Sequence, residues 1–292
     1  MRFNYAPLLV TGALAVGSII CSIACSSPTS ESNSPVNPAI TNFEVNQTVK
    51  SLTKNYLCEG EDAVFADSLK IYSSVQLFVE WPNELGGKEI KALQDSLIKS
   101  ISPDSTIKSI DAALTASADQ PEGIDTYKMS PVDSIPQSGP SMVYSKMTSA
   151  SVLSFNTDYI VYKISNYIYS GGAHGITESH YINYDLNSGS AINFENAFIP
   201  NFENKLLDAI KSSLMEQYSV STIDALQERG IFTDQLFVTH NIYLDGYDVV
   251  FHYNPYDIGP YALGSIDVRV PYYTIQELLT PNVKQLLSKV SI

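Results

Sequence analysis

The segment from Leu69 to Trp81 alternates between apolar and polar residues, and this two-residue period constrains the fold more than any other feature of the chain. Successive side chains of a β-strand point to opposite faces, so a segment of this kind buries one face and leaves the other polar. The apolar face carries Leu69, Ile71, Val75, Leu77, Val79 and Trp81. Residues 88–101 follow with apolar side chains at helical spacing, which predicts an amphipathic helix packed on this strand.

Further strands are predicted in the middle and near the end of the chain. Residues 149–156 and 158–169 are rich in β-branched and aromatic side chains, and a third segment of this kind covers 178–186. The strongest local signal is Asp245-Gly246, which lies between two apolar runs and is typical of a two-residue hairpin turn. A last strand is predicted at 266–270, after a loop rich in Pro, Gly and Tyr.

Helices are predicted in groups rather than between successive strands. The segment 200–218 has an apolar stripe, and a shorter helix is expected to end at Gly230 and a last one to cover 275–279. Residues 103–140 are rich in Ser, Asp and Pro and are interpreted as a long excursion with room for one short helix. Because strands and helices cluster, the sequence predicts an α+β fold of two sheet-and-helix units with mainly antiparallel strands, meeting near residues 176–190.

The N-terminus is typical of an export signal. Residues 1–24 combine a positive charge at Arg2 with an apolar run, and no second long apolar run follows. Ala24 before Cys25 resembles the cleavage box of bacterial lipoproteins, in which the cysteine is lipidated and becomes the first mature residue. Ser22 departs from the leucine usual at the start of that box, and an ordinary secretory signal or an uncleaved anchor is the alternative.

The residues after the signal predict how the protein is held. Ser, Pro and Asn dominate residues 25–41, so we expect a flexible tether. Lipid on Cys25 would attach the chain to a membrane surface without spanning the membrane. No acid precedes Glu31 after the cysteine, which favours the periplasmic face over the cell surface. Cys58 is then the one remaining thiol and is expected to be a small buried residue.

The charge of the chain restricts its partners. The formal net charge is −14, and it is −15 without residues 1–24, which contain Arg2 and no acid. Nucleic acid is not an expected partner, because binding phosphates needs a basic footprint. A basic protein is permitted, although solubility alone also accounts for an acidic surface.

Glycines surround a histidine in "YSGGAHG" at 169–175. Gly171 and Gly172 permit positive φ at a strand end, which is the structural interpretation, and the alternative is a backbone cradle in which His174 faces a ligand. No catalytic residue is expected, because Ser170 lacks the Gly-x-Ser-x-Gly setting and no acid at regular spacing orients His174. The usual ligand spacings of zinc sites are missing too, so neither a metal nor a cofactor is expected.

A second loop, "NPYDIGPYALG" at 254–264, has two Pro-Tyr pairs on either side of Asp257. It is either a rigid connection whose tyrosines cover the core, or a recognition surface. In the second case Tyr256, Asp257 and Tyr261 would contact a sugar hydroxyl or a basic partner. We expect both loops to lie at the junction of the two units, where ligand clefts are common.

The order of these motifs resembles a known domain pair. "YSGGAHG", "YINYDLNSG" and "VVFHYNPYDIGPYALGSIDVRVPY" are similar to segments of the envelope domains found in RsiV and PdaC, over roughly residues 42–285. The resemblance implies a PdaC-type deacetylase-associated domain at 42–176 and an RsiV-like C-terminal α/β domain of unknown function at 177–292.

The resemblance implies a location and a kind of module rather than an activity. RsiV binds lysozyme through its outer part, and PdaC is a peptidoglycan deacetylase whose catalytic machinery lies in a separate domain. We therefore expect a lipid-anchored cell-envelope protein acting as a non-catalytic binding or sensing module for peptidoglycan or an envelope protein such as lysozyme. The alternative is a cell-wall hydrolase or deacetylase.

Overall fold

The computed structural model describes residues 44–60, 69–137, 141–200 and 202–288. The expected signal peptide, the tether and Cys25 lie outside these ranges. Within the described ranges, every helix is too short or too polar to cross a membrane.

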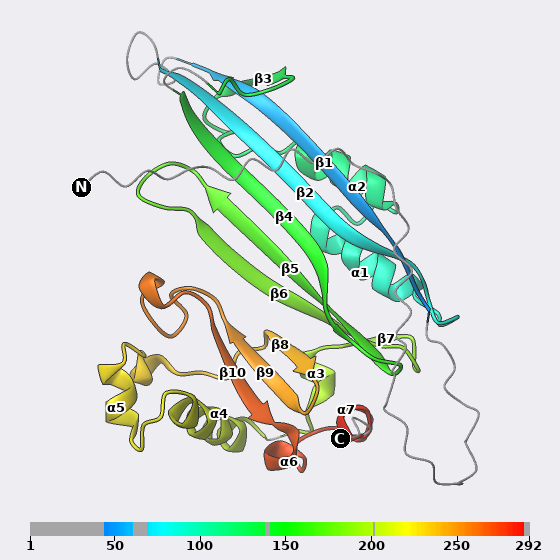
Figure 1. Cartoon of the computed structure of the whole chain (residues 1–292), viewed down its shortest axis with the longest axis vertical. Helices are drawn as coiled ribbons and strands as arrows, with labels where there is room; N and C mark the ends of the chain where they lie inside the picture. The colour runs from blue at the N-terminus through cyan, green and yellow to red at the C-terminus, as the bar shows by residue number, and fades with distance from the viewer. Residues whose placement is uncertain (1–43, 61–68, 138–140, 201, 289–292) are drawn as a thin grey trace, which may run out of the picture.

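A seven-stranded sheet forms the long upper part of the molecule (Figure 1). The strand order is β3-β1-β2-β4-β5-β6-β7, and neighbours are antiparallel except for the parallel pair β2 and β4. The strands are β1 (Val45–Glu59), β2 (Lys70–Leu85), β3 (Lys128–Val132), β4 (Ser141–Phe155), β5 (Tyr159–Tyr169), β6 (Ile176–Asp185) and β7 (Ser190–Ile192). The alternation that predicted β2 is confirmed, because Ile71, Val75, Leu77 and Val79 are all buried.

Two helices cover one face of this sheet. In the view of Figure 1, α1 (Lys91–Ile101) and α2 (Ile110–Ala118) lie behind the strands. Their apolar side chains form one core with β2, β4 and β5. Residues 103–140 thus contain an ordered helix, and they also contain β3, which pairs with the end of β1.

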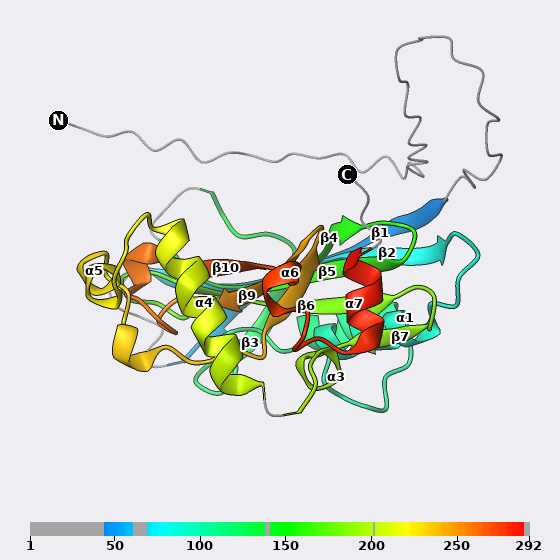
Figure 2. The ribbon, with the colours of Figure 1, turned by 90° about the horizontal axis from the view of Figure 1, so that it is seen from below.

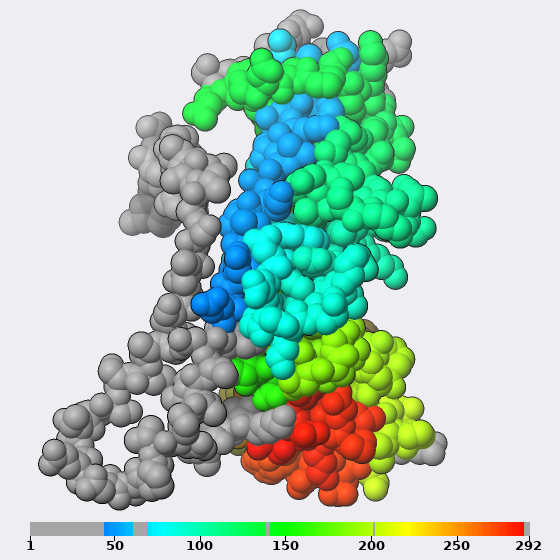
Figure 3. Space-filling view, turned by 90° about the vertical axis from the view of Figure 1, so that its right-hand side faces the viewer, coloured from blue at the N-terminus to red at the C-terminus, as the bar shows by residue number. Residues whose placement is uncertain are grey.

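A smaller antiparallel sheet of order β10-β9-β8 forms the lower part of the molecule. Its strands are β8 (Ile242–Asp245), β9 (Asp248–Tyr253) and β10 (Ile266–Pro271). The helices of this part are α3 (Phe194–Ala197), α4 (Glu203–Gln217), α5 (Ile223–Glu228), α6 (Tyr272–Ile275) and α7 (Pro281–Ser288), with short 3-10 turns at Thr233–Gln235 and Tyr261–Leu263. Figure 2 shows α4 and α7 from below, and Figure 3 shows the C-terminal segments below the strands and helices of the larger part. The expected α+β class with mainly antiparallel strands is confirmed.

Two local predictions are wrong in detail. Asp245 pairs with Asp248, so the two loop residues of the hairpin are Gly246 and Tyr247 rather than Asp245 and Gly246. Gly246 has φ +62°, which suits the first loop position of a type II′ hairpin. The last helix is α7 and not 275–279, because Pro281 is favoured at a first helical position and restarts the helix after Ile275.

Strand β5 joins the two parts through its two faces. Ile160, Tyr162 and Ile164 belong to the core under α1 and α2. Tyr159 and Val161 belong to the core of the smaller sheet, where α4 also packs. Strand β6 pairs with β5 over its whole length, so the larger sheet continues past residue 176 and the smaller sheet begins with β8.

Asparagine side chains connect the facing edges of β6 and β8. The buried Asn183 amide donates to Ile242 O at 2.9 Å, and Leu244 N donates to Asn183 Oδ1 at 2.9 Å. In the opposite direction, two asparagines of the smaller sheet bind the backbone of Ser179. Ser179 N donates to Asn254 Oδ1 and Asn241 Nδ2 donates to Ser179 O, both at 2.7 Å. Side-chain amides therefore satisfy backbone groups that no neighbouring strand reaches.

Replacing Asn183 tests how much this junction stabilises the fold. Asn183→Ala leaves Ile242 O and Leu244 N buried without their partner, so we expect the free energy of unfolding to fall by about 2–4 kcal/mol. The exposed Asn83, whose amide donates only to Asn46 at 3.1 Å, provides a matched control in Asn83→Ala. Urea unfolding of the two variants gives the comparison, and losses of equal size would contradict a structural role of the junction amide.

Candidate functional site

The two loops predicted to matter lie against each other. The ring of His174, from the loop between β5 and β6, stacks on the ring of Tyr261 with centroids 3.8 Å apart and planes 15° apart. Gly175 O accepts a hydrogen bond from the Tyr261 hydroxyl at 2.8 Å and lies 3.1 Å from His174 Nδ1. Because a carbonyl oxygen only accepts, Nδ1 is the ring nitrogen that donates to it.

The glycines shape the histidine loop. Gly171 and Gly172 have φ +93° and +89°, which an L side chain rarely adopts. A Cβ on Gly175 would lie 2.5 Å from the ring of Tyr167, so any other residue there would require this ring to move. Gly172 has open space around its Cα. These positions confirm that the loop needs glycine for its backbone, and they hold His174 at the surface.

The second loop contains a strained tyrosine. Residues Asn254 to Asp257 form a tight turn in which Asp257 N donates to Asn254 O at 3.1 Å and Asn254 N donates to Asp257 Oδ2 at 2.7 Å. Pro255 precedes Tyr256, which has φ +76°. A turn with proline followed by positive φ normally carries glycine or asparagine at the second position. A tyrosine at this position costs about 1 kcal/mol or more.

His174, Tyr261 and Tyr256 together form a continuous row of rings, here named the aromatic ladder. Tyr256 tilts against Tyr261 with centroids 5.6 Å apart, and 51% of Tyr256 is exposed. The ladder therefore presents aromatic faces from two loops at the junction of the two sheets. Asp257 lies beside it, but its carboxylate closes the turn.

A polar network lies beneath the second loop and was not predicted. Asn254 Oδ1 is 3.2 Å from His252 Nε2, and His252 Nδ1 is 2.6 Å from Asp267 Oδ1. The Tyr243 hydroxyl donates to Asp267 Oδ2 at 3.1 Å, and the Tyr181 hydroxyl lies 3.2 Å from His252 Nδ1. Only 2% of His252 is exposed. The network thus connects β6, β8, β9 and β10 around one buried imidazole.

Both ring nitrogens of His252 face acceptors. Asn254 Oδ1 already accepts from Ser179 N, which fixes it as an oxygen that accepts on the Nε2 side of the ring. The Asp267 carboxylate accepts from Nδ1. Burial alone would raise the pKa of the Asp267 carboxyl, but the hydrogen bond and charge of His252 outweigh it and hold that pKa below its ordinary value. Burial also raises the pKa of the Tyr181 and Tyr243 hydroxyls, so both remain protonated; Tyr243 donates to Asp267, whereas Tyr181 can only accept from an Nδ1 that donates.

Cysteine and potential metal ligands are the other reactive residue types of the chain. Cys58 is buried, and burial raises the pKa of its thiol to about 11, which suppresses the reactive thiolate. Among the described residues, no group of three or more His, Cys, Asp and Glu side chains could hold a metal ion.

Comparison with known proteins gives a partial family match and a fold. A family described as "Protein of unknown function (DUF3298)" matches residues 195–273, which include both tyrosines of the ladder as well as His252 and Asp267. Two crystal structures of DUF3298 family proteins are similar in fold. One, from Bacteroides fragilis, has a TM-score of 0.65 at 21% identity, covering 84% of this chain and 97% of that one. The other, from Pseudomonas aeruginosa, has a TM-score of 0.54 at 18% identity, covering 80% and 95%.

The comparison with curated proteins found no match. At these identities, the two structural similarities support the fold alone.

The lowered pKa of Asp267 predicts how stability changes with pH. We expect Asp267→Asn to lower the free energy of unfolding by about 1–2 kcal/mol at about pH 6, a modest value because 43% of this side chain is exposed. The carboxylate's contribution is complete above its ordinary pKa of 3.8 and disappears as pH falls below this value through the lowered folded pKa. The difference between the two proteins in urea unfolding should therefore shrink near pH 3. A difference that is constant from about pH 6 to pH 3 would contradict the pairing.

Proposed function

We propose that this protein is a non-catalytic binding or sensing module of the cell envelope and that its ligand binds at the aromatic ladder. The observation that carries the proposal is Tyr256, a half-exposed tyrosine kept in a backbone conformation that favours glycine. Strain of this kind persists where a side chain is needed at one place, and it concentrates at binding sites. Stacked, exposed rings of this type bind apolar faces of sugars or anchor a protein partner.

The position of the ladder also supports binding. Its two loops come from different sheets. The hydroxyl of Tyr261 in one loop donates to the carbonyl of Gly175 in the other, and His174 Nδ1 lies 3.1 Å from the same oxygen. The rings are therefore held in place before a ligand arrives, which lowers the ordering cost of association.

For the ligand, charge favours a basic envelope protein such as a lysozyme over peptidoglycan itself. The chain has a formal net charge of −14, so long-range attraction would speed its encounter with a basic protein. The resemblance of the loops to those of RsiV points to the same ligand class, whereas the resemblance to PdaC points to peptidoglycan. We accordingly propose an RsiV-like relationship for the whole pair of units, with peptidoglycan as the second ligand to be tested.

The decisive variant is Tyr256→Gly, because it separates binding from folding. Glycine relieves the strained φ, so the free energy of unfolding should be equal to or up to about 1 kcal/mol above that of the unchanged protein. Binding to lysozyme, measured by surface plasmon resonance with the full chain in detergent, should weaken about tenfold or more through a faster off-rate. Higher salt should instead slow the on-rate.

Tyr247→Gly is the matched control, since Tyr247 is an exposed tyrosine in the β8–β9 turn, outside the ladder. It should leave binding unchanged. The same measurement with soluble peptidoglycan fragments tests the second ligand. Saturable binding to neither ligand would overturn the proposal. Released sugar, acetate or peptide that disappears in His174→Ala would also overturn it, and would favour a cell-wall hydrolase or deacetylase.

We further propose that lipid on Cys25 anchors the protein, on the periplasmic face of a membrane. The expectation rests on the sequence before and after this cysteine. Cys25→Ala should abolish acyl labelling and move the protein from the membrane fraction to the soluble fraction. Unchanged labelling and fractionation would show that another segment provides the attachment.

A further inference from the structure

The outer edge of β10 has unpaired backbone groups. His252 N donates to Asn241 O, so the backbone of His252 faces β8. Its partner in β10 is Asp267, and in antiparallel pairing the N–H and C=O of that residue must then point away from β9. The same reasoning applies to Arg269, which pairs with Val250 two residues further along. Within the described residues no hydrogen bond to these four groups is found.

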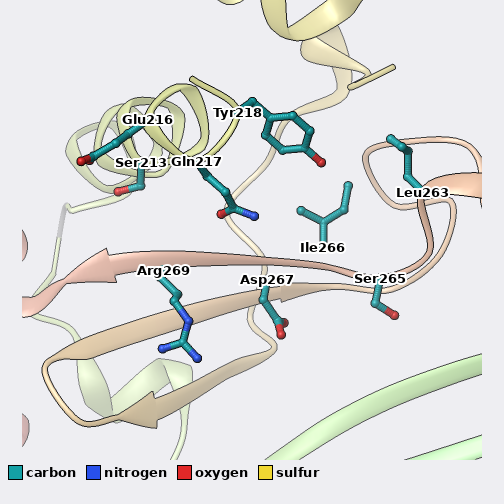
Figure 4. Close-up of a pocket in the computed structure, with 9 residues that line it drawn as sticks. All are labelled: Ser213, Glu216, Gln217, Tyr218, Leu263, Ser265, Ile266, Asp267 and Arg269. Carbon is teal, nitrogen blue, oxygen red and sulfur yellow. The ribbon is translucent and has the colours of Figure 1, made fainter. Parts of the chain in front are cut away.

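A groove faces this edge directly. It has a volume of about 530 Å³ and lies between β10 and the last turns of α4. Figure 4 shows Ser213, Glu216, Gln217 and Tyr218 on one side of the β10 strand and Asp267 and Arg269 on the other. A groove with walls on both sides of a strand edge has the shape that an added strand needs, because the side chains of that strand alternate between the two walls.

The charges of the groove favour a basic occupant. The carboxylate of Glu216 lies on one wall and that of Asp267 on the other, where Asp267 is paired with His252 at 2.6 Å. Arg269 is already paired, with Asp245 at 2.6 Å and Asp248 at 3.3 Å, so its charge is compensated. Among the described residues, no ion pair neutralises Glu216.

We propose that the β10 groove binds an extended basic segment of a partner protein, which adds to the smaller sheet as a further strand. The backbone groups of Asp267 and Arg269 would pair with the segment, and the carboxylate of Glu216 would bind one of its Lys or Arg side chains. β10 is six residues long and ends at Pro271, which has no N–H to donate. The bound segment is therefore about as short as β10 itself. This site is separate from the aromatic ladder and does not depend on its function.

Two other occupants fit the charges less well. A second copy of the chain would bring its own −14 charge and place the same acidic groove residues opposite each other. Residues 25–43 of this chain contain Glu31 and no Lys or Arg, so they offer nothing for Glu216 to bind.

A short designed peptide tests the proposal on the full chain in detergent. The probe is a fluorescently labelled six-residue strand that alternates Lys with Val and Thr. Its controls are the same peptide with Glu in place of Lys and a form methylated at every backbone amide. Fluorescence anisotropy should show saturable binding of the Lys peptide, binding at least about tenfold weaker for the Glu peptide, and none for the methylated peptide. Hydrogen exchange should slow in residues 265–271 when the Lys peptide binds.

Variants of the chain locate the binding. Glu216→Lys should weaken the Lys peptide about tenfold, whereas Asp208→Lys, an equal charge change at an exposed position of the same helix, should have a much smaller effect. Tyr256→Gly should leave peptide binding unchanged, which separates this site from the ladder. The proposal is overturned by absent binding, by equal binding of the methylated peptide, by equal effects of the two lysine variants, or by unchanged exchange in residues 265–271. Sedimentation as a dimer with this segment already protected would assign the groove to a second copy instead.

Discussion

Three asparagine side chains hold the two sheets together by completing the hydrogen bonding of strand edges that have no strand beside them. A side-chain amide carries one acceptor and donors in the geometry of a peptide group, so Asn183 can replace a residue of a neighbouring strand. Its side chain binds the backbone of Ile242 and Leu244 in β8. The side chains of Asn241 and Asn254 bind the backbone of Ser179 in β6. If β6 and β8 paired directly, the two sheets would merge into one continuous sheet. The amides instead allow both to end at the junction with few buried backbone groups left unpaired.

The candidate site depends on this junction. Asn254 binds Ser179 with its side chain, contacts His252, and begins the turn that carries Tyr256. The strained φ of Tyr256 is thus held by the contacts of Asn254 with Ser179 and His252 as well as by the hydrogen bonds within the turn. Tyr261 in turn reaches across to Gly175 on the other sheet's loop. The position of each ring in the ladder therefore follows from hydrogen bonds that also fix the relative position of the two sheets.

Much of the fold could be predicted from periodicity, because β2 and the helix stripes each bury one clear face. The sequence also singled out His174, Tyr256 and Tyr261 as candidates, because glycine- and proline-rich loops that carry ring side chains can be recognised without a structure. It did not show that these rings stack, because that contact joins residues 87 positions apart, from Tyr261 to His174, and local patterns carry no such information. The polar network was missed for another reason. His252 of this network and Asn183 of the junction sit at strand positions where side-chain type alone does not reveal burial, although asparagine is depleted in strands and its presence in "YINYD" was an available signal.

The strand edges of this protein are protected in different ways, and the outer edge of β10 differs from the others. Along β1, Lys50 and Lys54 form ion pairs with Asp111 and Asp119 of the α2 region, so this edge carries charged side chains. At β6 and β8, asparagine side chains occupy the edge. Natural sheets cover or charge their edges because an open edge recruits other strands. At the outer edge of β10, the last turns of α4 form one wall of a groove, no side-chain amide binds the edge, and Glu216 and Asp267 lie on the two walls. Acidic walls repel further copies of an acidic chain while they attract a basic strand, so the same charges prevent self-association and select a partner.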